Sequence, residues 1–150
     1  MFRMPSTPRP YSAARGKKLA DEGWRLHNGH RSGGKCLAGV RQSVESSGIL
    51  PHGVPWTPRE VGAYQWGLYA VSHPTELARR GFRRVTGVSV NHLQQGSIIV
   101  WKAGQCGYNR TNGHIEIVRD TTSTIACSDF CGHIKKTCGS PFAVFIPTTI

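Results

Sequence analysis

The spacing of apolar residues changes once along the chain. In the first half they recur every three or four residues, as Leu37, Val40 and Val44 do, and this spacing predicts a helix over 35–47. Gly48 marks the end of that helix, because glycine commonly follows the last helical turn. The first half of the chain is therefore expected to be helical.

A second helix is expected in the segment WTPREVGAYQWGLYA, which starts at residue 56. Thr57 can serve as N-cap, Pro58 fits the first helical position, and Glu60 completes a capping box. This helix should break at His73-Pro74, because proline cannot continue a helix in progress. The next segment, PTELARRG, is typical of a short helix closed by a glycine.

From residue 82 onward the apolar residues alternate with polar ones or form short runs, which is typical of strands. The predicted strands are FRRVTGV (82–88), GSIIVWK (96–102), GHIEIVR (113–119), STIACSDF (123–130) and FAVFIP (142–147). Helices followed by a meander of strands predict an α+β domain with an antiparallel sheet.

The N-terminal residues 1–18 are basic and rich in proline, so they are expected to form a flexible arm ahead of one domain at 19–150. Within that domain, 19–34 should begin with a helical turn and continue as a glycine-rich loop. No apolar run approaches the roughly 20 residues of a membrane span, and the N-terminus lacks the apolar stretch of a secretory signal.

The net charge of +11, from 19 Lys and Arg against 8 Asp and Glu, suits an anionic partner such as nucleic acid, anionic lipid or an acidic cell-wall polymer. Arg79, Arg80, Arg83 and Arg84 form a local positive cluster, so a basic nucleic-acid-binding module is an alternative. Against it, the sequence carries no nucleic-acid-binding motif, and its aromatics do not interleave with basic residues.

The chain has five cysteines, an odd number that leaves at least one unpaired. The four that crowd together are Cys106, Cys127, Cys131 and Cys138. They are expected to form two disulfides, which fits an oxidising compartment, although the sequence does not fix the pairing. A zinc site that includes His133 is the alternative, but the spacing C-x3-C-x-H-x4-C is not a usual zinc pattern. No cofactor is expected.

The remaining cysteine, Cys36, opens the helix predicted over 35–47. Gly33 and Gly34 let the backbone turn tightly before it, and Lys35 adds positive charge. The N-terminus of a helix stabilises a thiolate through its partial positive charge and its free N–H groups. Cys36 is therefore a candidate nucleophile.

His114 begins the strand predicted at 113–119 and is a candidate base. Alternation along that strand places His114 and Glu116 on one face, with Ile115 and Ile117 on the face toward the core. A helix N-terminus approaching His114 would allow its imidazole to take the proton of a thiol.

A base histidine works best when a polar group fixes its ring. The strand predicted at 123–130 can pair beside the His114 strand, which brings Asp129 near His114 and makes Asp129 the expected orienting residue. Ser128 is an alternative, and so is Glu116, which lies roughly 7 Å along the same strand and is expected to be the poorer orienter.

The segments KCLAGVRQSVESSGI, LQQGSIIVW, NGHIEIV and CSDF, in this order, resemble the NlpC/P60 and CHAP superfamily of papain-like cysteine peptidases. The resemblance covers about 30–146, with Ser97 at a position where the family commonly has Asp. It implies a papain-like α+β fold, with N-terminal helices packed on an antiparallel sheet. It also implies Cys36 as nucleophile, His114 as base and Asp129 as third residue.

The same resemblance implies a peptidoglycan hydrolase that cleaves an amide bond of the cell-wall peptide. An acyltransferase or deamidase on the same scaffold is the alternative, because a fold does not settle the substrate. Either a phage endolysin or a type VI secretion effector with a cognate immunity protein would act in the bacterial periplasm or cell wall. Trp24, His30 and Trp56 are candidates for lining the substrate cleft.

Overall fold

The computed structural model describes residues 7–56 and 62–150 of the chain. Within them the helices are α1 (Ala13–His27), α2 (Cys36–Ser47), α3 (Ala63–Ser72), α4 (Pro74–Arg79) and a short 3-10 helix, η1 (Gln105–Gly107). The strands are β1 (Phe82–Val85), β2 (Ile98–Trp101), β3 (His114–Val118), β4 (Ile125–Cys127), β5 (Cys131–His133) and β6 (Ala143–Pro147).

The strands form a single sheet in the order β1-β6-β2-β3-β4-β5, and every neighbouring pair is antiparallel. All five predicted strands are present, and the α+β prediction is confirmed. The segment 123–130 differs from its prediction, because its strand ends at Cys127. The backbone N–H of Ser128 donates to the carbonyl of Phe130 at 2.8 Å, and this tight turn leads into β5, which the pattern did not predict.

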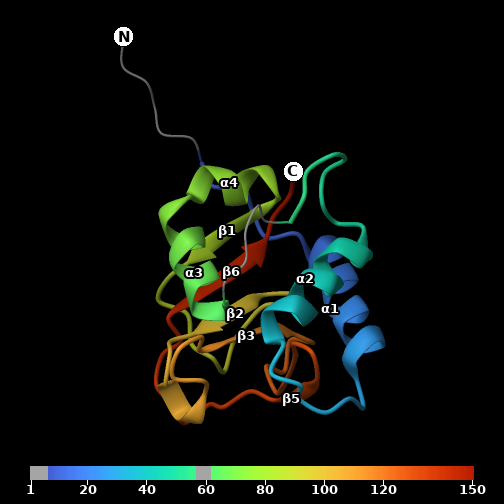
Figure 1. Cartoon of the computed structure of the whole chain (residues 1–150). Helices are drawn as coiled ribbons and strands as arrows, with labels where there is room; N and C mark the ends of the chain where they lie inside the picture. The colour runs from blue at the N-terminus through green and yellow to red at the C-terminus, as the bar shows by residue number, and fades with distance from the viewer. Residues whose placement is uncertain (1–6, 57–61) are drawn as a thin grey trace.

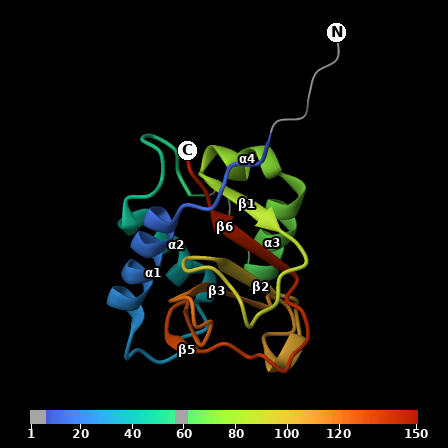
Figure 2. The same cartoon turned by 180° about the vertical axis from the view of Figure 1, so that it is seen from behind.

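The two faces of the sheet are covered differently, as Figures 1 and 2 show from opposite sides. One face packs against the four α-helices, and its core includes Leu19, Val40, Val44, Trp66, Leu77, Ile98, Val100, Ile115, Ile117 and Phe145. The other face is covered by loops, and its smaller core includes Val90, Leu93, Ile99, Trp101, Val118, Ala126, Ile134 and Val144. The residues at 115 and 117 face the helices, as alternation along the strand predicts.

Helix α1 is much longer than the helical turn predicted at the start of 19–34. Two glycines inside it resemble helix breakers in the sequence, but each marks a close contact. A Cβ at Gly16 would overlap the carbonyl oxygen of Gln95, and Gly23 lies against the side chain of Cys127. These glycines therefore let α1 approach its neighbours closely, and the contacts offset the low helix propensity of glycine.

The start of α1 also corrects the expected arm at 1–18, because residues 13–18 are helical. Ser12 caps the helix by accepting a hydrogen bond from the backbone N–H of Arg15. The half-buried guanidinium of Arg15 then donates to the carbonyl oxygens of Ile49, Arg80, Gly81 and Thr148. It thereby joins α1 to the C-terminal segment, so these residues belong to the folded domain.

Helix α3 begins at Ala63, with Gly62 as its N-cap. The capping box expected at Thr57, Pro58 and Glu60 lies outside the described residues. The predicted break is confirmed, because His73 ends α3 and Pro74 opens α4. None of the helices in the described part of the chain is both long and apolar enough to cross a bilayer.

The predicted pair of disulfides is present. Cys106 bonds to Cys138, and Cys127 bonds to Cys131 across the β4–β5 turn. This arrangement supports the disulfide alternative over the zinc site, because all four sulfur atoms are used in bonds to one another. Cys36 is the free cysteine.

Candidate active site

Cys36 is the first residue of α2, where the sequence predicts it. The helix is anchored by the buried side chains of Leu37, Val40 and Val44, so its N-terminus is held at a fixed place above the sheet. Gly34 has a positive φ of 71°, which a residue with a side chain adopts at a cost. The thiol is half-buried at the helix N-terminus, a position that favours the thiolate.

His114 is the first residue of β3, opposite Trp101 of β2, and its side chain is buried. A Cβ at Gly113 would overlap the carbonyl oxygen of Trp101, so only glycine lets the chain enter the strand this closely. The ring of Tyr108 stacks on the imidazole, with centroids 4.3 Å apart and planes 7° from parallel. The register of the sheet and this stack together fix the position of the histidine.

The carboxylate beside the imidazole is that of Glu116, two residues along the same strand. Its Oε1 lies 3.3 Å from Nε2 of His114, and its Oε2 accepts a hydrogen bond from Nε1 of Trp101 at 2.7 Å. Glu116 is only 4% exposed, and a buried carboxylate is stable when its oxygens are partnered in this way. Because Nε2 faces Glu116, the nitrogen left for the thiol is Nδ1.

The electrostatics couple the three side chains. Burial alone would lower the pKa of His114, but hydrogen bonding to Cys36 and Glu116, together with their negative charge, raises it to about 9. The imidazole is therefore protonated at neutral pH, beside a cysteine and a buried carboxylate. Burial and the nearby charges of Glu116 and Cys36 raise the pKa of Tyr108, so its phenol keeps its proton.

Asp129, the expected orienting residue, has different partners. Its Oδ2 accepts from the backbone N–H groups of Gly33 at 2.7 Å and Lys35 at 3.1 Å, and its Oδ1 accepts from Ser128. Burial alone would raise the pKa of Asp129, but these hydrogen bonds stabilise the carboxylate and lower it. Asp129 thus holds the loop that precedes Cys36, and Glu116 occupies the place beside His114.

The turn that carries Asp129 is docked firmly on α2. Gly39 lies so close to it that a Cβ there would overlap the carbonyl oxygen of Ser128. The disulfide between Cys127 and Cys131 closes the base of the same turn. Residues on α2, β4 and β5 therefore act together to place the 33–35 loop.

Three adjoining hollows form one cleft across these residues. The first lies between the starts of α2 and α3, the second contains both Cys36 and His114, and the third lies beyond His114 and ends at Lys135. Cys36 lines the first two hollows and His114 lines the last two. The cleft therefore passes over the sulfur and the imidazole, and a substrate lying along it meets both.

The three residues expected to line the cleft lie elsewhere. Trp56 is 1% exposed and stacks on Trp66 in the core, where its large ring is fully used in packing. Trp24 lies under the guanidinium of Arg119, which follows the end of β3 away from His114. His30 is exposed in the loop before α2 and is absent from the lining of the three hollows.

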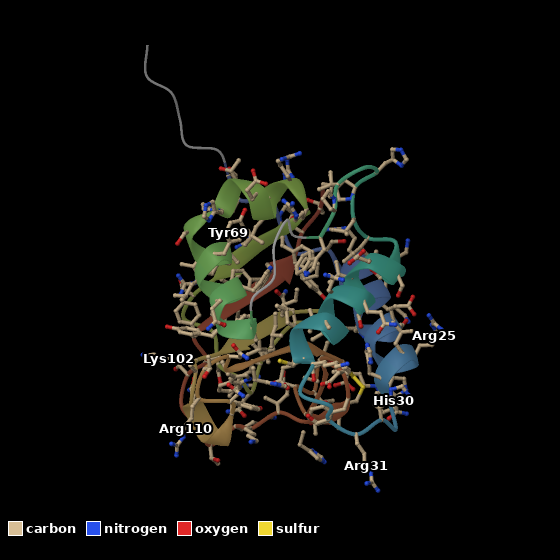
Figure 3. The ribbon with its side chains drawn as sticks, viewed as in Figure 1. Arg25, His30, Arg31, Tyr69, Lys102 and Arg110 are labelled. Carbon is tan, nitrogen blue, oxygen red and sulfur yellow. A yellow bond between two sulfur atoms is a disulfide. The ribbon has the colours of Figure 1, made fainter. Side chains whose placement is uncertain are left out.

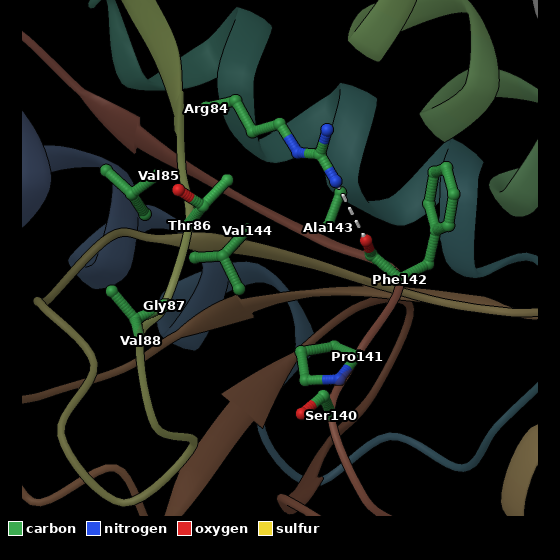
Figure 4. Close-up of a pocket in the computed structure, with 10 residues that line it drawn as sticks. All are labelled: Arg84, Val85, Thr86, Gly87, Val88, Ser140, Pro141, Phe142, Ala143 and Val144. Atoms are coloured by element: carbon green, nitrogen blue, oxygen red, sulfur yellow. Dashed lines mark hydrogen bonds between the residues drawn. The ribbon is translucent and has the colours of Figure 1, made fainter.

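A separate hollow lies where β1 ends and β6 begins (Figure 4). In it the guanidinium of Arg84 donates to the carbonyl of Phe142 at 3.3 Å and lies over the Phe142 ring. Its lining includes no cysteine, histidine or carboxylate, so it lacks the groups needed for nucleophilic chemistry. Among the described residues, no group of three or more His, Cys, Asp or Glu is placed to hold a metal ion.

The fold and the site together define a class. An antiparallel sheet covered on one face by helices, with a cysteine at the start of one helix and a histidine at the start of a central strand, is the papain-like arrangement. The fold class predicted from the sequence is confirmed.

Comparison with known proteins agrees with this fold. No family model matches the chain, and no curated protein matches it. A chain of the native type VI effector-immunity complex Tae3-Tai3 from Ralstonia pickettii has a TM-score of 0.56 at 20% identity, covering 89% of this chain and 98% of that one. The selenomethionine form of the same complex has a TM-score of 0.52 at 20% identity, covering 85% and 97%. Membership in NlpC/P60 or CHAP in particular stays a prediction.

From the sequence, Glu116 was ranked too low as the partner of His114, and Tyr108 was not identified as a neighbour of the imidazole. Glu116 carried a usable signal, because a carboxylate inside an otherwise apolar strand, on the same face as a histidine, is costly unless it has partners. Tyr108 gave no such signal, since it lies in an irregular loop and reaches His114 only through the tertiary fold.

Proposed function

We propose that the chain is a cysteine amidase that hydrolyses an amide bond of the peptidoglycan peptide. The observation that carries the proposal is the contact between Cys36, at the start of a helix, and His114, which is backed by the buried Glu116. A nucleophile, a base and a group that holds the base, meeting in an open cleft, are the parts that acyl transfer requires.

In the first step, the thiolate of Cys36 attacks the carbonyl carbon of the amide, and the carbonyl oxygen takes the negative charge. Collapse of this tetrahedral intermediate breaks the carbon–nitrogen bond, and the imidazolium of His114 gives its proton to the leaving amine. Glu116 keeps the ring oriented and stabilises its positive charge. The product is a thioester on Cys36 and a free amine.

The oxyanion needs N–H donors near the sulfur. Asp129 already occupies the N–H groups of Gly33 and Lys35, so these two are not available. The first N–H groups of α2, from Cys36 onward, have no partner within the helix and point toward its N-terminal end. They are the donors that suit the oxyanion. In the second step, His114 takes a proton from water, which attacks the thioester and releases the acid.

We further propose that the chain acts as a type VI effector in the periplasm of a target cell, where a cognate immunity protein would inhibit it. The support is the similarity of fold to a type VI effector-immunity complex. That similarity favours an effector over an endolysin. The two disulfides suit an oxidising compartment, and the charge of +11 suits an anionic cell wall.

The test is digestion of purified peptidoglycan, with the products identified by mass spectrometry. We expect the wild-type chain to release new amine and carboxyl termini at one amide bond. Cys36→Ala and His114→Ala should each lower the rate on the order of 10⁴-fold or more, because the three groups act as a unit. Cys36→Ala should keep the wild-type melting temperature within a few degrees, whereas His114→Ala should lower it, because it leaves the buried Glu116 carboxylate without the imidazole.

His30→Ala is the matched control, because it removes an exposed histidine from the loop before α2 and leaves the cleft lining unchanged. Its rate should equal that of the wild type. Turnover that survives Cys36→Ala would refute the nucleophile. Release of sugar fragments with no new termini in the peptide would refute the amidase.

A further inference from the structure

We propose that the third hollow of the cleft binds a free carboxylate of the substrate, with Lys135 as the residue that recognises it. The proposal rests on the proposed function, since it assigns the substrate group that lies beside the scissile amide. The hollow is lined by Ser32, Tyr108, His114, Glu116, Phe130, Gly132, His133 and Lys135. Lys135 is the one lysine or arginine in that lining.

The ammonium of Lys135 is held in place before any ligand arrives. Its Nζ lies 4.3 Å from the centroid of the Tyr108 ring and donates to the carbonyl oxygen of Cys106 at 3.0 Å. One of its three N–H donors is used in this way, and two remain for a ligand. An ammonium that is already fixed loses little side-chain entropy when it binds an anion.

A series of contacts places Lys135 relative to His114 and Cys36. Lys135 lies over Tyr108, Tyr108 stacks on His114, and His114 faces Cys36. A carboxylate bound by Lys135 therefore lies on the histidine side of the scissile amide, at the Tyr108 ring that stacks on the imidazole. Phe130 and Tyr108 give the hollow aromatic walls, which suit the aliphatic part of an acidic residue.

The charges around the cleft point to the same class of ligand. Three further cations lie on lining residues or next to them in sequence, and all three are exposed: Arg31, Lys35 and Arg110. Figure 3 shows Arg31 and Arg110 projecting from the lower end of the molecule. The two carboxylates that line the cleft, Glu116 and Asp129, already accept hydrogen bonds. The cleft therefore offers net positive charge to a peptide with free carboxyl groups.

The experiment measures binding rather than turnover, using the full chain with Cys36→Ala so that the ligand survives. The probes are a disaccharide tetrapeptide from peptidoglycan and the same compound with its carboxyl groups converted to primary amides. Calorimetry should show that the acid form binds about tenfold tighter than the amide form, as expected for a hydrogen bond to a charged group. Adding Lys135→Met should remove that preference, while the methionine retains most of the apolar contact with Tyr108.

Lys136→Met is the matched control. It removes the same charge at the next residue of the chain, whose side chain is exposed and does not line the hollow. It should keep the preference for the acid form. The proposal is overturned if Lys135→Met keeps the preference, if acid and amide forms bind equally to the Cys36→Ala chain, or if neither form binds. Failure of the proposed function is seen separately, as absence of hydrolysis by the wild-type chain even though the acid form binds preferentially.

Discussion

The strand side of the site is buried, whereas the loop side is exposed. His114 and Glu116 are 7% and 4% exposed, and they lie on a central strand beside the fully buried Trp101. Gly33, Gly34 and Lys35 are exposed on the loop before Cys36. Backbone N–H groups of this loop donate to a single carboxylate, that of Asp129, which joins the loop to the β4–β5 turn. Two carboxylates are thus used for different purposes: one holds a side chain inside the sheet, and the other holds backbone at the surface.

This difference separates two demands of the proposed reaction. Proton transfer needs a fixed imidazole with a raised pKa, and a buried carboxylate on the same strand provides both conditions. The nucleophile needs a thiolate and free N–H donors beside a substrate that must enter and leave, so it lies at a helix end next to an open cleft. We therefore expect damage to the strand side to change the pH profile, and damage to the loop side to change the rate alone.

Of the changes that compare the two sides, Glu116→Gln should have the largest effect and lower kcat/KM on the order of a hundredfold. The protonated imidazole exists below about pH 9, so the wild-type activity should fall as pH rises through about 9. In the variant, burial of the ring still lowers the pKa of His114, while the charge of Glu116 is gone. The alkaline limb should therefore move to lower pH, as measured by kcat/KM against pH.

The same shift affects stability. Because the folded-state pKa of His114 is about 9 and its ordinary value is 6.5, its contribution to stability is complete below about pH 6.5 and is lost as pH rises through about 9. Unfolding by urea at pH 6 and pH 9.5 should show this loss in the wild type and less of it in Glu116→Gln. An unchanged alkaline limb in the variant would show that another group sets the pKa of His114.

A smaller effect is expected from Asp129→Asn. The amide oxygen can still accept from the backbone of Gly33 or Lys35, but the charge that strengthens both hydrogen bonds is lost. We expect kcat/KM to fall about tenfold, with the alkaline limb at the wild-type pH. The measurement is the same pH profile, so the two carboxylates are compared directly.

Ser128→Ala is the control for this variant, since it removes the hydroxyl next to Asp129 and leaves the bonds to the loop intact. Its rate should stay within about twofold of the wild type, because the hydroxyl-carboxylate hydrogen bond is only one of several that Asp129 accepts. A shift of the alkaline limb in Asp129→Asn would place Asp129 on the strand side of the site and contradict the division argued above.

The contrast between the carboxylates also shows what the sequence could predict. Local signals were sufficient to place Cys36 at the start of a helix and His114 at the start of a strand, because each position shows in a few neighbouring residues. Which carboxylate, Glu116 or Asp129, lies beside His114 depends on the directions of the side chains along β3 and on where the β4–β5 turn packs. Trp101, which donates a hydrogen bond to one oxygen of Glu116, is 15 residues away in the chain, and no spacing rule reveals that contact.

The fold shows the same limit. Periodicity predicted the order of helices and strands, because the core faces of α2 and β3 are apolar at regular intervals. It missed most of α1, because Gly16 and Gly23 reflect close packing against other segments rather than the end of a helix. Trp56 was a candidate cleft residue and lies in the core, since a tryptophan near a predicted helix start has the same appearance in the sequence whether it lines a cleft or fills a core.

A still smaller effect on rate than that of Asp129→Asn should come from removing the disulfide at the base of the β4–β5 turn. Replacing Cys127 and Cys131 by serine frees the turn that carries Asp129, but Gly39 of α2 still packs against it. We expect kcat/KM to fall only about threefold, because the remaining contacts hold the turn most of the time and a loss of this size corresponds to less than about 1 kcal/mol. The measurement is steady-state hydrolysis under non-reducing conditions.

The Cys106–Cys138 disulfide should stabilise the fold more than the Cys127–Cys131 disulfide, because it closes the longer loop. The Cys106–Cys138 bond joins residues 32 apart, and the Cys127–Cys131 bond joins residues 4 apart. Chain entropy then gives a loss of about 4 kcal/mol in the free energy of unfolding for the first pair and about 2 kcal/mol for the second. Urea unfolding of the two double-serine variants measures both losses. An equal loss in both variants, or a larger one for the short loop, would mean that the bond near Asp129 stabilises native contacts of the turn, and the loop side of the site would then be as firmly held as the strand side.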